Sequence, residues 1–172
     1  AIGDNARGIE LLTRAIELTR RLRGDEHPEI ARLDNNLAGI HLRLGDYAKA
    51  LELHRKALEL RRKLLGPAHA DTANSASNTG DALLNLGRAA EARPFFEEAL
   101  AGFAASYGET HPSYGAALAY RGVADVRLGK IKPGIAAIER GIAIMVAVAD
   151  PQLQHLADAR FGLAQALWPR DK

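Results

Sequence analysis

The sequence predicts an all-α fold, a solenoid of antiparallel helix pairs, from three observations. Glycine recurs every 42 residues, at Gly3, Gly45, Gly87 and Gly129. Between these glycines, apolar residues recur at helical spacing. Turn-forming pairs such as Gly66-Pro67 separate the helical stretches. A fixed period of this length is typical of stacked repeats, in which each unit covers its apolar face with its neighbours.

Residues 5–23 form the first expected helix. Ile9, Leu12 and Ile16 follow a helical spacing, and Gly24-Asp25 supplies the turn that ends the helix. No partner helix precedes it, so we interpret residues 3–23 as the second helix of a truncated repeat. The chain, taken as a single array over 1–172, is therefore expected to be a fragment of a longer protein.

The first complete repeat is expected over 28–65. Pro28 is placed where a helix can begin without losing a needed amide, which predicts a helix over 28–44. The second helix, over 47–65, carries the oppositely charged pairs Glu52–Lys56 and Glu59–Lys63 four residues apart. We expect these charges to solvate its outer side.

The same cycle is expected over 70–107 and 112–149, with helices near 70–86, 89–107, 112–128 and 131–149. A last helix, over 151–168, follows the pattern of the first helices, which gives about eight helices in three complete repeats and a half repeat at each end.

Small residues occupy the positions where paired helices must approach closely, because larger side chains would push the pair apart. They are Ala38, Gly80, Gly122 and Ala164 on first helices, and Gly8, Ala50, Ala92 and Gly134 on second helices.

Composition and motifs argue against several classes of function. The 23 basic residues are balanced by 21 acidic ones, which does not indicate a nucleic-acid binder. The most apolar run, 131–149, contains charged residues and a proline that would be costly in lipid, so we expect a cytoplasmic protein without a membrane segment. The chain has no cysteine, no phosphate-binding loop and no nucleophile elbow, so neither an enzyme nor a cofactor is expected.

Three loop histidines, His27, His69 and His111, recur with the repeat. Equivalent atoms in successive repeats lie roughly 16–20 Å apart at the usual helix spacing. One metal ion cannot bridge that distance. We therefore expect each histidine to hydrogen-bond its own turn or cap the following helix, and we expect no metal site.

Taken together, these positions resemble the tetratricopeptide repeat, whose pattern reads here as Gly80, Gly87, Ala92, Phe96 and Ala99. The 42-residue period, the Gly-x-x-His loops and the run AEARPFFEEAL are most similar to the long-repeat class typified by kinesin light chain. His54 departs from the pattern by replacing the aromatic residue. The closing ADARFGLAQALW resembles the carboxy-terminal tails of bacterial signalling proteins such as serine/threonine kinases.

The resemblance implies a right-handed superhelix whose first helices line a concave groove for a peptide or a helix of a partner protein. A polar stripe agrees with this: Arg32, Asn36, Gly39 and Arg43 recur as Asn74, Asn78, Asp81 and Asn85, then as Ala116, Tyr120, Val123 and Arg127. An asparagine side chain offers both donors and an acceptor, so it can pair with a peptide backbone. The expected peptide-binding residues are Arg32, Asn35, Asn36, Arg43, Asn74, Asn78, Asp81, Asn85, Tyr120 and Arg127.

Several alternatives remain open. The asparagines could merely solvate an exposed helix face, the arginines could bind a carboxylate, and Tyr120 could anchor a ligand or cover the edge of the core. The expected function is a protein-interaction scaffold. One alternative is self-association through apolar surface along 5–23 and 152–167, and another is a regulatory tail acting on a linked enzyme such as a kinase.

Overall fold

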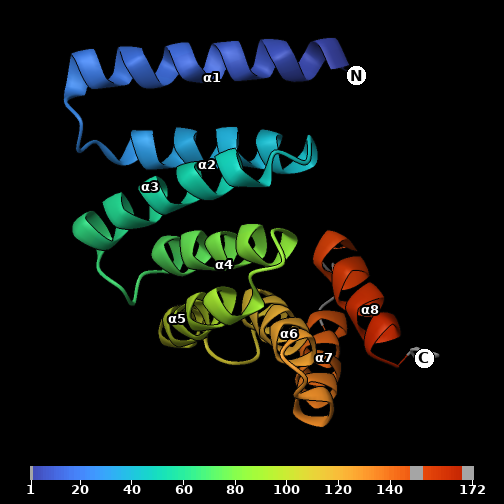
Figure 1. Cartoon of the computed structure of the whole chain (residues 1–172). Helices are drawn as coiled ribbons and strands as arrows, with labels where there is room; N and C mark the ends of the chain where they lie inside the picture. Colours follow the sequence, from blue (N-terminus) through green and yellow to red (C-terminus); the bar gives the residue numbers. More distant parts are fainter. Residues whose placement is uncertain (1, 148–152, 168–172) are drawn as a thin grey trace.

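The computed structural model describes residues 2–147 and 153–167, and over these residues the chain is helical throughout, with short turns (Figure 1). The expected limits at 149, 151 and 168 fall outside the described residues. The helices are α1 (Ile2–Arg23), α2 (Pro28–Arg43), α3 (Tyr47–Leu65), α4 (Ala70–Asn85), α5 (Ala89–Tyr107), α6 (Pro112–Arg127), α7 (Ile131–Val146) and α8 (Leu153–Leu167).

The helices form a solenoid in which each helix packs against the next along the chain. Figure 1 shows the stack running from α1 at one end to α7 and α8 at the other. The alternate helices α4, α6 and α8 also contact one another in sequence order, so the first helices of successive repeats share one side of the stack. The expected all-α solenoid of eight helices is confirmed in the described part of the chain.

The loop histidines cap three of the first helices. His27, His69 and His111 each hold an extended backbone just before a helix, and each Nδ1 accepts a hydrogen bond from the backbone N–H two residues later, at 3.1–3.2 Å. This satisfies one of the free N–H groups at a helix start. The capping role expected from the sequence is confirmed for all three histidines.

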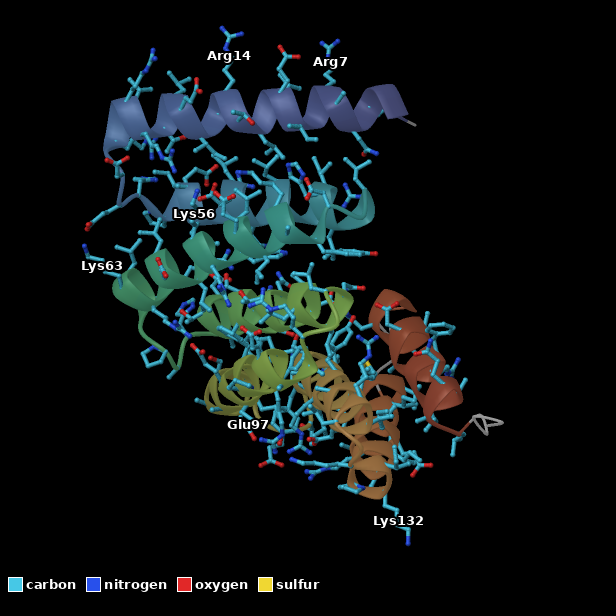
Figure 2. All side chains as sticks on the ribbon, viewed as in Figure 1. Arg7, Arg14, Lys56, Lys63, Glu97 and Lys132 are labelled. Atoms are coloured by element: carbon cyan, nitrogen blue, oxygen red, sulfur yellow. The ribbon has the colours of Figure 1, made fainter. Side chains whose placement is uncertain are left out.

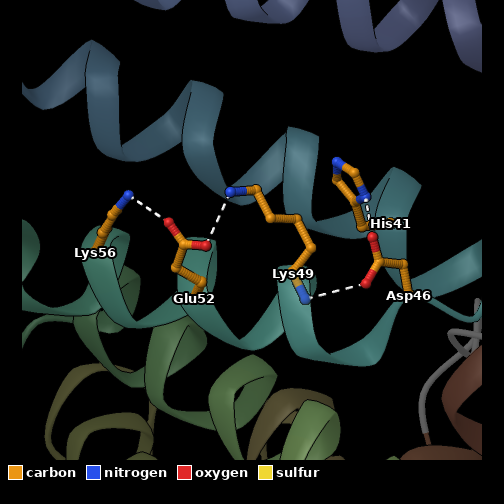
Figure 3. Close-up of polar contacts among 5 residues, drawn as sticks. All are labelled: His41, Asp46, Lys49, Glu52 and Lys56. Atoms are coloured by element: carbon orange, nitrogen blue, oxygen red, sulfur yellow. Dashed lines mark hydrogen bonds and ion pairs between the residues drawn. The ribbon is translucent and has the colours of Figure 1, made fainter.

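Asp46 closes the turn between α2 and α3 (Figure 3). Its carboxylate accepts a hydrogen bond from the Lys49 backbone N–H at 3.3 Å and lies 3.2 Å from His41 Nδ1. Farther along α3, Glu52 accepts from Lys49 Nζ at 2.8 Å and from Lys56 Nζ at 2.6 Å. The expected Glu52–Lys56 pair is therefore present.

The second expected pair on α3, between Glu59 and Lys63, is not formed. Lys63 Nζ instead contacts the Glu26 carboxylate in the loop before α2. A long lysine side chain near the end of α3 can reach a neighbouring loop as easily as the preceding turn of its own helix, and helical spacing alone does not decide between the two.

Small residues allow close approach within each helix pair. A Cβ added to Gly80 of α4 would lie 2.7 Å from the Phe96 ring of α5. A Cβ on Gly122 of α6 would lie 2.7 Å from the carbonyl oxygen of Gly134 on α7. Both distances are below van der Waals contact, which explains why the sequence keeps small residues at these positions.

The core is a series of apolar clusters between neighbouring helices rather than one central cluster. Phe96, Leu83 and Leu58 are almost completely buried between second and first helices. Ile138 and Met145 of α7 are fully buried near α8. Among the described helices, none is both long enough and apolar enough to cross a bilayer.

Candidate functional site

Two adjoining cavities lie along the side formed by the first helices. The α8 cavity, of about 310 Å³, is lined by Leu42, Arg43, Tyr47, Asp81, Leu84, Asn85, Tyr120, Val123, Arg127, Asp158, Phe161, Gly162 and Gln165. The α2 cavity, of about 490 Å³, is lined by Leu12, Asn35, Asn36, Gly39, Ile40, Leu42, Arg43, His54, Asn78 and Asp81. Since Leu42, Arg43 and Asp81 line both, the two cavities form one continuous surface, which we call the groove.

Most of the expected peptide-binding residues line this groove. They are Asn35, Asn36, Arg43, Asn78, Asp81, Asn85, Tyr120 and Arg127. Arg32 lies elsewhere: its Nε donates to Glu29 Oε2 at 2.8 Å, and it lines a separate hollow that includes Arg61. Asn74 is exposed and lines neither cavity of the groove. Because neither residue lies in the groove, the structure gives no support for a binding role of Arg32 or Asn74, and that role stays a prediction.

Asn35, His54 and Asn78 form a hydrogen-bonded cluster in the α2 cavity. Asn35 Oδ1 accepts from Asn78 Nδ2 at 3.0 Å and lies 2.9 Å from His54 Nδ1. Burial, with a smaller effect from the Arg61 charge, lowers the pKa of His54 to about 4, so its imidazole is neutral at pH 7. Because Asn35 Oδ1 can only accept a hydrogen bond, the proton of the neutral His54 ring is assigned to Nδ1.

This arrangement fixes the orientation of the two asparagine side chains. Because Asn35 uses its oxygen and Asn78 uses one N–H of its amide, Asn35 keeps its Nδ2 donors and Asn78 keeps its Oδ1 acceptor and a second N–H. A free amide donor and a free amide acceptor can each pair with a peptide group. The cluster thus ties α2, α3 and α4 together through side-chain hydrogen bonds.

Asp81 lies where the two cavities meet. Its Oδ1 accepts a hydrogen bond from Asn85 Nδ2 at 3.0 Å. Burial, with a further contribution from the Asp158 carboxylate of α8, raises the pKa of Asp81 to about 6, although the Asn85 hydrogen bond and the Arg127 charge oppose this shift. Ionised Asp81 is therefore held at a cost in free energy.

Tyr120 joins α6 to α8 at the far side of the groove. Its ring stacks on Phe96, with centroids 5.8 Å apart, and its hydroxyl donates to Asp158 Oδ2 at 2.9 Å. The hydroxyl also lies 3.2 Å from His155 Nδ1. Burial, together with the nearby carboxylates, strongly raises the pKa of Tyr120, so its hydroxyl stays protonated. Tyr120 covers the edge of the core and also lines the α8 cavity.

The two arginines of the groove differ in their surroundings. Arg127 Nη1 donates to the Leu84 backbone carbonyl oxygen near the end of α4, which also accepts a hydrogen bond from the Gly87 N–H at 3.0 Å. Arg43 is exposed and lines both cavities, without a described hydrogen bond. Arg43 is thus the arginine better placed to meet a carboxylate of a ligand.

Comparison with known proteins agrees with this architecture. Residues 29–105 match the family model of the tetratricopeptide repeat. Residues 29–105 are therefore tetratricopeptide-repeat (TPR) sequence, and the other described helices continue the same stacked arrangement. No curated protein gives a significant sequence match to the chain.

Solved structures share the fold of this TPR array. BtubC (BKLC) from P. vanneervenii superposes with a TM-score of 0.80 at 20% identity over 95% of this chain, which spans 65% of that protein. Two structures of a kinesin light chain candidate from Podosopora anserina, with nearly identical TPR-like repeats, give TM-scores of 0.76 and 0.74 at 22% identity. They also cover 95% of this chain, which spans 77% and 78% of theirs.

TPR arrays are generally scaffolds for protein–protein interaction, and proteins of this kind are typically not enzymes. Within the described residues no group of three histidine, aspartate or glutamate side chains is close enough to hold a metal ion. The similarity of the closing segment to tails of bacterial signalling proteins stays a prediction.

The polar stripe, taken one period further along the TPR array, would have identified more of the groove. Asp158, Gly162 and Gln165 of α8 follow Ala116, Tyr120 and Val123 by 42 residues, and all three line the α8 cavity. Phe161 takes the register position of the expected residue Asn35, three periods later, so the repeat could have pointed to it. Tyr47 lies outside the stripe, and the repeat pattern gave no signal for it. His54 was visible only as a departure from the aromatic residue of the family pattern.

Proposed function

We propose that the groove of this TPR array binds an extended segment of a partner protein. The observation that supports this most directly is the Asn35–His54–Asn78 cluster, which presents a fixed donor and a fixed acceptor in the α2 cavity. An extended chain has free backbone groups to pair with them. A helix satisfies its backbone groups internally, so an extended segment is the better match.

The α8 cavity would hold side chains of the same segment. The apolar part of its wall is formed by Leu42, Tyr47 and Phe161. Its polar groups come from Asp81, Arg43 and Gln165. At about 310 Å³ it is at the lower end of ligand pockets, which suits one or two side chains rather than a drug-sized molecule. Backbone pairing in one cavity and side-chain contacts in the other would together set affinity and selectivity.

The test is selection of peptides of about 12 residues from a random displayed library, followed by calorimetric titration of those selected. Replacing Asn78 and Asp81 together by Ala should weaken binding roughly tenfold or more, because net hydrogen bonds contribute about 0.5–1.5 kcal/mol each. A double variant on the second helices, Glu97→Ala with Lys132→Ala, serves as the control and should bind as the parent does. Both positions are exposed (Figure 2).

Circular dichroism separates loss of binding from loss of structure. The groove variant should keep its helical content. If the variant folds and binds every selected peptide with unchanged affinity, or if the control pair weakens binding equally, the groove is not the binding surface.

Self-association through the end helices is a second candidate function. Leu11, Leu18 and Leu22 of α1 are 57%, 55% and 73% exposed, and Phe161 and Leu167 of α8 are 66% and 60% exposed. Apolar side chains gathered on the two end helices favour association between molecules. Sedimentation over a concentration range tests this, and a single monomeric species throughout would exclude it.

A further inference from the structure

We propose that the array opens at one preferred place, the junction between α5 and α6, where an ion pair takes the position of an apolar contact. This junction lies inside the stack, and its opening is a property of the free protein, whether or not a segment binds in the groove. Two features support the assignment: the residues that meet across the junction, and the way in which α5 begins.

An ion pair connects α5 to α6. Arg93 Nε donates a hydrogen bond to Asp125 Oδ1 at 2.9 Å, and the Asp125 side chain is only 6% exposed. The other second helices carry an apolar residue at the position of Arg93: Ile9, Leu51 and Ile135. Leu51 belongs to one apolar cluster with Leu83, the equivalent of Asp125. A polar pair at the α5–α6 junction thus replaces the two leucines of the α3–α4 junction.

The charges at this junction are incompletely matched. Lys130 Nζ and Arg121 Nε lie 3.8 Å and 3.9 Å from the Asp125 carboxylate, which is too far for hydrogen bonds. Arg121 Nε is buried and has no hydrogen-bond partner among the described residues. Taking charged groups out of water costs free energy, and pairing them returns it fully only when their remaining donors and acceptors are also satisfied. The junction is therefore weaker than one made by two leucines.

Each charge also keeps a partner on its own side when the two helices separate. Arg93 Nη1 lies 2.9 Å from Glu97 Oε1, on the same helix. Asp125 keeps the nearby charges of Arg121 on α6 and Lys130 in the following turn. Separation therefore exchanges one hydrogen bond for hydrogen bonds to water and isolates neither charge. Separation at the α3–α4 junction would instead expose two leucine side chains to water, which is unfavourable.

The start of α5 adds to this weakness. Its N-cap residue, Arg88, makes no side-chain capping hydrogen bond, whereas Asp46 before α3 accepts one from the Lys49 backbone N–H at 3.3 Å. Pro94, in the second turn of α5, has no N–H to donate to the preceding turn, and its equivalent on α3 is Glu52. The start of α5 thus lacks two hydrogen bonds that α3 can form.

Opening at this junction changes one cavity of the groove and preserves the other. The α8 cavity is lined by Asp81, Leu84 and Asn85 from α4 and by Tyr120 and Arg127 from α6. Separation of α6 from α5 moves these two sets of side chains apart. The hydrogen-bonded cluster of the α2 cavity lies on α2, α3 and α4, so it stays intact. The groove therefore has one fixed half and one half that can widen.

The experiment compares two buried alanines in the same register. Ala124 on α6 and Ala82 on α4 are both completely buried, and three described helices lie on the outer side of each junction. The chain has no cysteine, so Ala124→Cys or Ala82→Cys introduces a single thiol. The rate at which this thiol reacts with an aromatic disulfide reagent in native buffer reports how often the junction opens. Circular dichroism confirms that each variant is folded.

The thiol of Ala124→Cys should react roughly tenfold faster, or more, than the thiol of Ala82→Cys. Adding Arg93→Leu with Asp125→Leu restores the apolar pair and should slow the reaction of Ala124→Cys about tenfold or more. The same two leucine substitutions should leave the reaction of Ala82→Cys unchanged. Equal rates in the two single-thiol proteins, or a rate for Ala124→Cys that the leucine pair does not lower, would overturn the proposal.

Native-state hydrogen exchange of the unsubstituted chain tests the same junction without any change of sequence. A helix pair that has lost its neighbour is only marginally stable, so the backbone amides of α6 and α7 should exchange faster than those of α3 and α4. The leucine pair should reduce this difference. If α3 and α4 exchange first, the weakest junction lies elsewhere and the assignment to α5–α6 is wrong.

Discussion

Replacing Asp81 by Asn should stabilise the fold above pH 6 and have little effect below pH 4. Asp81 ionises in the groove among the side chains of three helices: Asn85 on its own helix, Arg127 on α6 and Asp158 on α8. Arg43 of α2 lines the same cavity. Burial is the largest influence on the carboxyl group and the Asp158 charge adds to it, so the charged form is disfavoured in the folded state.

The magnitude follows from the two pKa values. The pKa of Asp81 rises from 3.8 to about 6 on folding. Each unit is worth 1.36 kcal/mol, which makes ionised Asp81 less favourable by up to about 3 kcal/mol. Because the folded pKa is the higher one, the stability that protonated Asp81 contributes is complete below pH 3.8 and is lost as the pH rises through 6.

An asparagine has the shape of the neutral carboxyl group and keeps an oxygen that can accept from Asn85. Asp81→Asn should therefore raise the free energy of unfolding by up to about 3 kcal/mol at pH 8, with the gain shrinking to near zero at pH 4. Partial solvent access at Asp81 makes this an upper value.

Urea unfolding followed by far-ultraviolet circular dichroism from pH 4 to pH 8 measures the effect. The curves are fitted with a nearest-neighbour model because repeat arrays need not unfold in one step. Asp25→Asn is the matched control, since the Asp25 side chain is 88% exposed, and its effect should be small at every pH. A gain that does not vary with pH would show that it does not come from the ionisation of Asp81. A loss of stability at pH 8 would show that Arg127 and Arg43 outweigh the cost of burying the Asp81 charge.

Substitutions at four further positions test the local physics with the same unfolding assay. His69→Ala removes a helix cap and should cost about 0.5–2 kcal/mol, whereas His69→Asn, a good capping residue, should recover most of it. Gly141→Ala places a Cβ against the backbone of α6 and should lower the free energy of unfolding by roughly 1–3 kcal/mol. Gly39→Ala should raise it by up to about 1 kcal/mol, because the new Cβ would have only Arg43 nearby, at 3.8 Å. Asp34 is 3% exposed and burial raises its pKa, so Asp34→Leu, which introduces the residue found at the equivalent position 118, should stabilise the array at neutral pH.

The repeat pattern predicted the parts of the structure that depend on local geometry. A 42-residue period fixes which positions share a register, so the turns and the close contacts at Gly80 and Gly122 follow from sequence. The capping by His69 was predictable for the same reason, because a side chain and a backbone N–H two residues apart need no tertiary information to meet.

The pattern could not predict contacts that depend on the position of the stripe relative to the groove. Arg32 and Asn74 occupy the first position of the stripe, near the starts of α2 and α4, and neither lines the groove. Asp158 has the same register on α8, yet it lines the α8 cavity and accepts a hydrogen bond from Tyr120. Equivalent residues thus meet different surroundings, because α8 packs closely on α6, whereas α4 has hardly any contact with α2.

The same reasoning connects the stability of the groove to its proposed use. Complete repeats bury small residues and Phe96 against each other, and these contacts hold the first helices in place whether or not a ligand is bound. Asp81 is different, since its charge is disfavoured in the empty groove and would gain from a donor supplied by a bound segment. If Asp81→Asn stabilises the free array while Asn78→Ala with Asp81→Ala weakens peptide binding, this carboxylate is retained for recognition at the expense of stability.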